Sequence, residues 1–331
     1  MPKVIPLRAI AFVLFPMLAG SVQGQQRTAL DFEPTVGAAA YLRGDGPIVL
    51  IDEGHHNFHT LGLTTDYDDA HQQVTMPGRY VPFAELLRRD GYVVRSLTSS
   101  FRRAALADAQ VLVIANALAE VNVDENYFDC NWSLPNPSAF SDDEIEVIVT
   151  WVREGGALLL IADHQPWPAA AARLAEQFGL LFYNGSTDRL QFRREIGSLQ
   201  DHPITQGRGL TEQIDFVLTF GGQAFRFAGD ITGDPLLIIP PNTTLALHWD
   251  PCLDLTDKVP RIRADGMLQG AAVPFGAGRV AAFGEAAMFT AQSWVEDGAV
   301  GVMGMNHPEA PQNAQFVLNV LHWLTGVLPV H

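Results

Sequence analysis

The chain has 331 residues, of which 47% are hydrophobic, and a formal net charge of -16. This composition allows a sizeable core in one large domain or two small ones, and it argues against wholesale disorder. The acidic balance argues against nucleic acid and anionic membrane surfaces as partners, whereas a small anionic substrate stays compatible because a local site can oppose the overall charge.

The first 24 residues have the pattern of a secretory signal peptide. Lys3 and Arg8 form a basic start, an apolar segment follows from residue 9 to 20, and a small-x-small cleavage site ends at Gly24. The apolar segment is about half the ~20 residues that span a bilayer, and no later run is long enough. We therefore expect cleavage near Gly24 and a secreted or periplasmic mature chain without a membrane span.

After a lead-in at residues 25–46, strand patterns alternate with helix patterns. Apolar runs predict strands at 47–52, 92–96, 110–116, 157–162 and 180–183. Helix patterns lie at 81–90, after the capping box Ser141-Asp142-Asp143-Glu144, and at about 168–178. Repeated βα units predict a mostly parallel sheet with helices on both faces.

Beyond residue 200 the patterns favour strands. Candidates lie at 214–220, 223–228, 235–239, 244–249 and 268–274, a hairpin joins 271–275 to 279–283, and a last helix covers 313–324. We expect an α/β fold in one domain at 47–326. Its β-rich part, at about 210–284, should extend the sheet antiparallel or cover one edge.

Polar side chains follow several predicted strands at their C-terminal ends, where open α/β sheets place their ligands. The first strand is followed by Asp52, Glu53, His55, His56, Asn57 and His59, and others end in Asn116, in Asp163-His164 and in Glu285. The candidate catalytic residues are Asp52, His55, His56, Asp163, His164 and Glu285. The candidate substrate-binding residues are Glu53, Asn57 and Asn116.

A His/Asp/Glu cluster suits a divalent metal, with zinc first, and it equally suits a general acid/base pair. The candidate metal ligands are His55, His59, Asp163, His164 and Glu285. A structural alternative is open for single residues: Asp52 and Asn57 as turn caps, Asp163 as the residue that orients His164, and Glu285 as a helix cap. The sequence does not show which of His55 and His56 faces the site.

Several standard motifs are absent from the sequence. There is no HExxH zinc motif, no G-x-S-x-G elbow and no P-loop, and Gly276-Ala277-Gly278 lies between two strand patterns, so no nucleotide cofactor is expected. The cysteines, Cys130 and Cys252, lie in polar loops. They could form a disulfide in an oxidising compartment or stay as free thiols.

The motif Phe275-Gly276-Ala277-Gly278-Arg279-Val280, the segment 202–207 (His-Pro-Ile-Thr-Gln-Gly) and the pair Asp163-His164 at the fourth-strand elbow resemble the class I glutamine amidotransferase-like superfamily. The likeness is greatest to its ThuA-like and gliding-motility or ABC-transporter auxiliary branches. It implies a flavodoxin-like three-layer sandwich. True amidotransferases carry a Cys at that elbow, so glutamine hydrolysis by the family mechanism is not expected.

Two functions follow as expectations. The first is a metal-assisted or acid/base hydrolase that acts on a small polar molecule, a sugar derivative by analogy with ThuA-like proteins. The second is a non-catalytic ligand-binding or envelope-assembly module with an envelope protein as partner.

Overall fold

The computed structural model describes residues 26–67, 73–123, 131–229, 233–247, 258–296 and 299–330. The predicted signal peptide, Cys130 and Cys252 lie outside these residues. Within the described ranges, no helix combines the length and apolar character needed to cross a bilayer.

The longer helices follow the predicted patterns closely. They are α1 (Val81–Arg89), α3 (Asp142–Arg153), α4 (Trp167–Gln177) and α6 (Asn313–Leu324). The short helix α5 (Pro203–Gln206) and the 3-10 turns η1 (Glu120–Asn122), η2 (Arg194–Ile196) and η3 (Ala287–Phe289) were not predicted. The predicted capping box of α3 is confirmed: the Ser141 hydroxyl accepts the N–H of Glu144, and the Glu144 carboxylate accepts the N–H of Ser141.

A nine-stranded sheet forms the centre of the molecule. Its strands, in spatial order, are β5 (Val93–Leu97), β2 (Ile48–Asp52), β6 (Val111–Ala115), β7 (Ala157–Ile161), β17 (Gly278–Phe283), β16 (Leu268–Phe275), β12 (Phe225–Phe227) and β8 (Leu180–Phe182), and β13 (Asp234–Ile238) also pairs with β16. The first five are parallel. Numbered by chain position, they run 2-1-3-4-5, the order of doubly wound sheets of the flavodoxin type.

The expectation of a mostly parallel sheet is wrong. The tight turn at Gly276 and Ala277 reverses the chain between β16 and β17, and a turn this short can join only antiparallel strands. β12 and β13 then pair with β16 antiparallel, and β8 pairs with β12 in the same way. The late strands therefore extend the sheet antiparallel, which is one of the two arrangements predicted for them.

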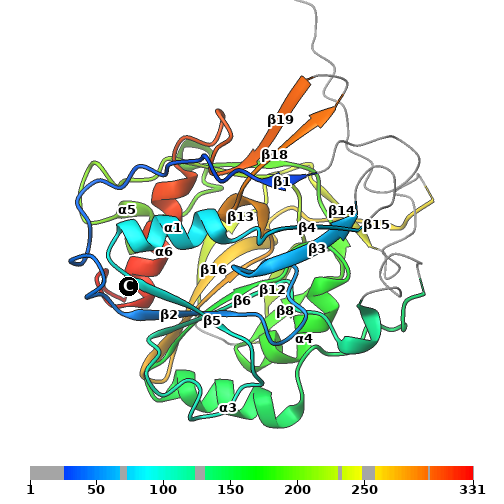
Figure 1. Ribbon diagram of the computed structural model, residues 1–331. Coiled ribbons are helices and arrows are strands. Elements are labelled where there is room, and N and C mark those ends of the chain that lie inside the picture. The colour runs from blue at the N-terminus through cyan, green and yellow to red at the C-terminus, as the bar shows by residue number, and fades with distance from the viewer. Residues whose placement is uncertain are drawn as a thin grey trace, which may run out of the picture.

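Helices cover both faces of the sheet, with α1 and α6 on one side and α3 and α4 on the other (Figure 1). The strand residues alternate between these two layers: Leu159 joins the cluster beneath α1 and α6, whereas Leu158 and Leu160 join the cluster beneath α3 and α4. Because both faces are buried, the strands carry continuous apolar runs.

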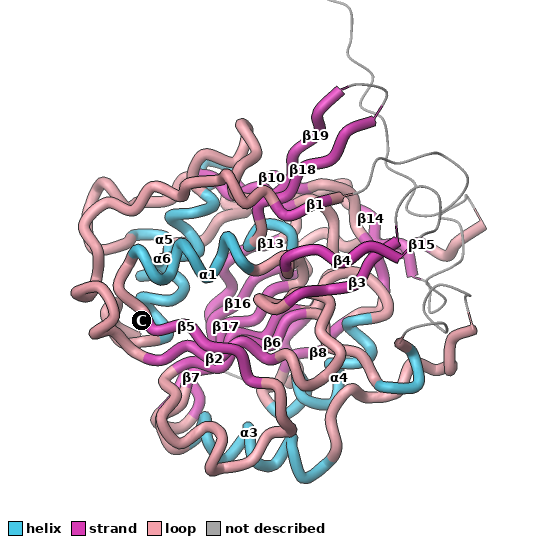
Figure 2. Tube along the Cα trace, viewed as in Figure 1, coloured by secondary structure: helices cyan, strands magenta, loops and turns pink. Residues whose placement is uncertain are grey.

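Smaller sheets surround this core. They are β1 (Arg27–Thr28) with β18 (Ala291–Glu296) and β19 (Ala299–Gly304); β3 (Leu63–Tyr67) with β4 (Gln73–Pro77); β10 (Leu190–Arg193) with β11 (Phe216–Thr219); and β15 (Arg261–Arg263) with β14 (Thr244–Leu247) and β9 (Gly185–Ser186). The β18–β19 hairpin projects from the body (Figure 2). The sequence patterns predicted neither this hairpin nor β3–β4, which lies between the predicted strand at 47–52 and the predicted helix at 81–90.

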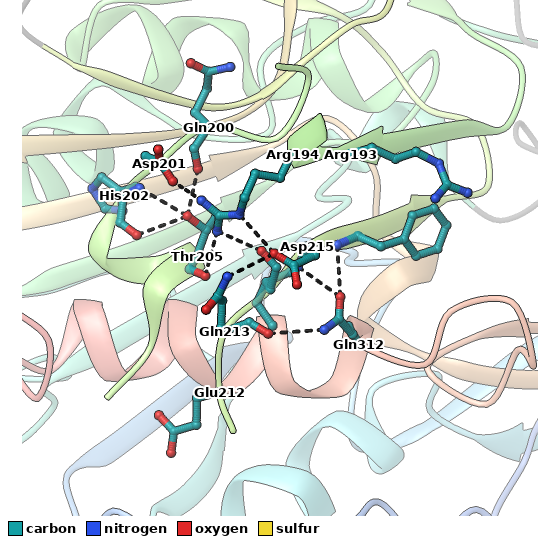
Figure 3. Close-up of polar contacts among 12 residues, drawn as sticks. Arg193, Arg194, Gln200, Asp201, His202, Thr205, Glu212, Gln213, Asp215 and Gln312 are labelled. Atoms are coloured by element: carbon teal, nitrogen blue, oxygen red, sulfur yellow. Dashed lines mark hydrogen bonds and ion pairs between the residues drawn. The ribbon is translucent and has the colours of Figure 1, made fainter. Parts of the chain in front are cut away.

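A polar network built around Arg194 ties β10 and β11 to the loop before α6 (Figure 3). Its guanidinium contacts the carboxylates of Asp201 and Asp215 and donates to the carbonyls of Thr205 and Ile214. The Gln312 side chain bonds the backbone of residues 213, 215 and 216. Because these partners are fixed backbone and carboxylate groups, we assign this network a structural role.

The lead-in is anchored at the other end of α1 from the predicted site. Asp90 and His322 are fully buried, and His322 Nε2 lies 2.7 Å from Asp90 Oδ2. The second Asp90 oxygen accepts the N–H of Ala40 at 2.8 Å, and the Tyr41 hydroxyl lies 3.2 Å from that of Thr325 on the chain after α6. This buried Asp90–His322 contact therefore holds the lead-in, α1 and α6 together.

Candidate functional site

The candidate site lies at the carboxyl ends of the parallel strands, around β2 and β6. In the 2-1-3-4-5 order, the chain leaves β2 and β6 in opposite directions, which opens a crevice between them. The loop after β2 at residues 53–62, Asn116 after β6, Asp163 after β7 and Glu285 after β17 all belong to this edge. The convergence predicted from the sequence is therefore present at the level of the strand ends.

One part of this edge is a set of three charged side chains in which His55 lies between Asp52 and Glu144. Nδ1 of His55 lies 2.8 Å from Asp52 Oδ1, and its Nε2 lies 2.9 Å from Glu144 Oε1 at the start of α3. The ring stacks on Phe101 with the centroids 4.2 Å apart. Both ring nitrogens face carboxylates, so both act as donors and His55 is doubly protonated.

The contacts between these three side chains shift the pKa values of His55 and Glu144. Burial works to lower the pKa of His55, but hydrogen bonds and charges from Asp52 and Glu144 outweigh burial and raise it. Burial likewise works to raise the pKa of Glu144, but hydrogen bonds from His55 and Ser141 lower it to about 2. His55 is thus a cation held between two carboxylates, and its role in this arrangement is to position the loop.

Of the residues next to His55, His56 faces solvent, and Glu53 and Asn57 bond to the backbone of the loop. His56 is exposed and has φ 49°, so of the two adjacent histidines His55 is the one that points inward. Glu53 accepts the N–H groups of Leu61 and Gly62, and buried Asn57 accepts the N–H of His55. The backbone of the loop after β2 is therefore shaped by Glu53, His56 and Asn57.

Asn116 and His59 form the second part of the site, and both are buried. Asn116 Oδ1 lies 2.9 Å from the N–H of Asp163, and Asn116 Nδ2 lies 3.1 Å from His59 Nδ1. Burial, with the charges of Arg79 and His164, lowers the pKa of His59 well below its usual value. Among the described residues, no hydrogen bond engages Nε2 of His59.

The contacts of His164 fix the position of its ring hydrogen. Its Nδ1 lies 2.7 Å from the carbonyl oxygen of Gln165, which can only accept, so Nδ1 carries the hydrogen. Nε2 is thereby left with its lone pair when the ring is neutral. The ring is half-buried and packs edge-on against Trp167 at 4.7 Å.

Asp163 and Glu285 are a buried carboxyl pair with backbone partners. Asp163 accepts the N–H groups of His164 and Ala286, which ties β7 to β17. Glu285 accepts those of Ala287 and Met288 at 2.8 Å each, so it caps η3. Burial and the charge of Asp163 raise the pKa of Glu285 well above its usual value, against the opposing effect of these N–H groups. The structural alternative considered for Glu285 is therefore realised.

Sequence reasoning missed several polar groups that surround His59 and His164. The buried hydroxyls of Tyr80 and Thr60, Oε1 of Gln165 and Nε1 of Trp167 have no hydrogen-bond partner among the described residues. Tyr80 packs against His59 with the ring centroids 5.0 Å apart. Burial, with the charges of Glu285 and Asp163, raises the pKa of the Tyr80 hydroxyl well above its usual value. A signal was available: helix N-termini lie at the same sheet edge as the strand C-termini. Tyr80 directly precedes α1, and Gln165 lies two residues before α4.

The five candidate metal ligands do not form a ligand set in this arrangement. Both nitrogens of His55 face carboxylates, Nδ1 of His59 faces Asn116, and both oxygens of Glu285 accept N–H groups. Among the described residues, no group of three or more His, Cys, Asp or Glu side chains could hold a metal ion. Metal binding stays a prediction, and we derive no chemical step from it.

A pocket is present elsewhere in the described part of the chain. It has a volume of about 370 Å³ and lies where the lead-in meets Arg89 at the C-terminal end of α1, whose N-terminal end is at the site. Its lining consists of lead-in residues 33–37 and 39 with Arg89, and Arg89 already bonds Glu85 and the carbonyl of Pro34. This pocket therefore offers none of the chemistry found at the strand ends.

The sheet order and its helical layers define an α/β protein with a doubly wound parallel half. No protein-family model matches the chain, and no curated protein sequence matches it. Similar solved structures include the mmIFT52 N-terminal domain, with 12% identity, a TM-score of 0.54, and coverage of 84% of this chain and 97% of that domain. This similarity shows the fold alone.

Structural neighbours also include putative ThuA-like proteins. The protein from Bacteroides uniformis has 11% identity and a TM-score of 0.46, and the match covers 88% of this chain and 95% of that one. The protein from Parabacteroides merdae has 12% identity and a TM-score of 0.40, and the match covers 86% of this chain and 92% of that one.

Proposed function

We propose that this chain binds a small polar molecule at the carboxyl ends of β2, β6 and β7 and hydrolyses it by acid/base chemistry. The observation that carries the proposal is the pair His59 and His164, each of which has Nδ1 engaged by a protein group, set among buried polar groups that have no partner among the described residues. Buried polar groups normally have hydrogen-bond partners, so such a group of exceptions is typical of a ligand site.

The two histidines take different roles in this proposal. Nε2 of His164 accepts the proton of the attacking water, because Nδ1 is already committed to the Gln165 carbonyl. Nε2–H of His59 donates a hydrogen bond to the substrate. Asp163 holds the backbone of His164 and Ala286 in place through its two oxygens and does not itself react.

The experiment is an activity screen of the mature chain, starting at Gln25, against chromogenic esters, amides and glycosides. We expect His164→Ala to lower the rate by about 100-fold or more, since a positioned general base contributes about 10²–10⁴-fold. His307→Gln, a half-buried histidine outside the site, serves as the matched control. Activity that survives His164→Ala would overturn the assignment of the base.

A second candidate function is ligand binding without catalysis. The observation that favours it is that each carboxyl oxygen of Asp163 and Glu285 accepts a backbone N–H group, so both side chains already have a structural role at this edge. Under this alternative, the screen finds no turnover, but small polar compounds still raise the melting temperature. Tyr80→Phe would then weaken that effect.

Location and kinship are part of the same proposal. The basic start, apolar segment and cleavage site at residues 3–24 support secretion or a periplasmic location, with an envelope protein as a further partner. The motif at 275–280, together with the 2-1-3-4-5 strand order, supports kinship with the amidotransferase-like superfamily. N-terminal sequencing of the exported protein tests the location, and a first residue other than one near Gln25 would contradict it.

A further inference from the structure

We infer that Asn116 is a positioning residue that fixes His59 as a neutral imidazole with its hydrogen on Nε2, directed at a carbonyl-type oxygen of the substrate. This inference deepens the proposed function and rests on it for the substrate's identity. Its first half concerns the ligand-free protein and is testable without any substrate.

The first step is the orientation of the Asn116 amide. The backbone N–H of Asp163 is a donor, and it lies 2.9 Å from one end of that amide. Only the amide oxygen can accept this hydrogen, so the end that faces His59 must be the NH₂ group. The orientation therefore follows from a backbone group that cannot change its role.

The second step transfers this constraint to the imidazole. The Asn116 NH₂ group lies 3.1 Å from Nδ1 of His59, and an NH₂ group can only donate. Nδ1 must then present its lone pair, which places the single ring hydrogen on Nε2. A doubly protonated ring would bring two donors together at this contact, so the cation is disfavoured.

The third step is that Asn116 is held rigidly enough to impose this choice. It is fully buried, its backbone has φ 52°, and its own N–H donates to the carbonyl of Ile161 at the end of β7. Its carbonyl accepts the N–H of Phe58 from the loop that carries His59. Asparagine tolerates the left-handed conformation better than most residues, so the position suits this side chain.

A neutral imidazole that donates from Nε2 is suited to polarising a carbonyl oxygen. It stabilises negative charge that develops on the oxygen without carrying a full positive charge itself. With His164 Nε2 as the proton acceptor, the pair fits attack of water on an ester or amide carbonyl. The water oxygen bonds to the carbonyl carbon while one water proton passes to Nε2 of His164. The C–O or C–N bond to the leaving group then breaks, His164 gives that proton to the departing alcohol or amine, and a carboxylic acid remains.

The test is NMR of the mature chain with isotope-labelled histidine, with His59→Gln used to assign the His59 ring signals. We expect the wild-type His59 ring to be neutral with its hydrogen on Nε2 throughout the range of about pH 5 to 8, in which an unperturbed imidazole changes its charge. Asn116→Asp keeps the bond to the Asp163 N–H and the shape of the side chain but turns the donor into an acceptor. His59 should then gain a hydrogen on Nδ1 and become protonated at higher pH than in wild type.

Two outcomes overturn the tautomer assignment: a wild-type His59 with its hydrogen on Nδ1 or with positive charge near neutral pH, and an Asn116→Asp variant whose His59 ring signals match wild type. If Asn116→Asp fails to fold by circular dichroism, the wild-type spectrum alone decides.

The substrate half is tested with acetamide, which offers a carbonyl oxygen, against methylammonium, which offers only donors. Saturable perturbation of the His59 Nε2 signal by acetamide alone supports the inference, and its absence overturns the carbonyl assignment. A correct tautomer in a protein that shows no hydrolysis in the screen would count against the proposed function and not against the role of Asn116.

Discussion

Nε2 of His55 and Oε1 of Glu144 lie 2.9 Å apart, although 89 positions separate the two residues in the chain. The same Glu144 closes the capping box of α3, so one carboxylate fixes both the start of a helix and the loop after β2. The loop that carries His59 is therefore held from the opposite face of the sheet by a buried cation between two carboxylates.

Because of this ion pair, the free energy of unfolding should pass through a maximum as the pH is varied. The pKa of His55 is raised above 6.5, so its contribution is complete below pH 6.5 and is lost as the pH rises through the raised value. The pKa of Glu144 falls from 4.5 to about 2, so its contribution is complete above pH 4.5 and is lost as the pH falls toward 2. The pair therefore stabilises the fold most between these limits.

We expect His55→Ala to cost about 3 kcal/mol in that window, because it leaves the buried Asp52 carboxylate without its partner. The variant should also flatten the two pH slopes. Urea unfolding across the pH range measures both effects. His56→Asn, at an exposed position that favours left-handed residues, should change stability by less than about 0.5 kcal/mol. Equal losses in both variants would contradict the structural role of His55.

Tyr80→Phe should separate stability from ligand binding. The Tyr80 hydroxyl is buried and has no hydrogen-bond partner among the described residues, so its removal should not lower the melting temperature of the free protein. The same change should weaken ligand binding or hydrolysis by about tenfold, as the loss of one hydrogen bond of about 1.4 kcal/mol would do. A variant with a clearly lower melting temperature would show that the hydroxyl already has a partner in the free protein.

Gly222 is expected to tolerate no side chain. A Cβ there would lie 2.1 Å from the carbonyl oxygen of Gly284 and 3.0 Å from Cβ of Glu285, and its φ of +96° disfavours other residues. Gly222→Ala should cost about 3 kcal/mol and displace Glu285. Gly209→Ala is the matched control, since a Cβ there meets nothing within 4 Å. Thermal unfolding compares the two, and equal midpoints would contradict the close approach.

The Asp90–His322 pair should behave as one coupled unit. His322→Ala leaves the fully buried Asp90 side chain with the N–H of Ala40 as its one remaining hydrogen-bond partner among the described residues, and we expect the free energy of unfolding to fall by about 3 kcal/mol. The double variant with Asp90→Ala should cost less than the sum of the single variants. Additive losses in a double-mutant cycle would show that the two side chains do not interact.

The parallel half of the fold was predictable because its strands are continuous apolar runs that end in polar residues. Runs such as Ile48–Ile51 and Ala157–Ile161 are buried on both faces, which local sequence reports directly. The antiparallel half was predictable only in part. The β16–β17 hairpin and an antiparallel extension of the sheet were expected, but short strands such as β12 and β8 pair with distant segments, and their partners are not encoded in their residues.

The site was predictable to the level of its positions. Asn116, Asp163 and Glu285 were singled out because they end strands, and they meet at one edge through backbone contacts. Their chemistry was not predictable, since it depends on which atom faces which: the His55–Glu144 contact and the Asn116–His59 contact join residues 89 and 57 positions apart. Tyr80 resembles a core aromatic in sequence apart from its place just before a helix, and its buried hydroxyl has no hydrogen-bond partner among the described residues.

Helix α1 connects two regions that otherwise share no residue. Tyr80, just before its first turn, packs on His59, while Asp90, just after its last turn, receives His322 and the lead-in. Nine helical residues make a rod of ~14 Å, which is too short to bend appreciably. A change in the contacts that the lead-in and His322 make with Asp90 would therefore tilt this rod as a unit and move the Tyr80 ring across the face of the His59 imidazole.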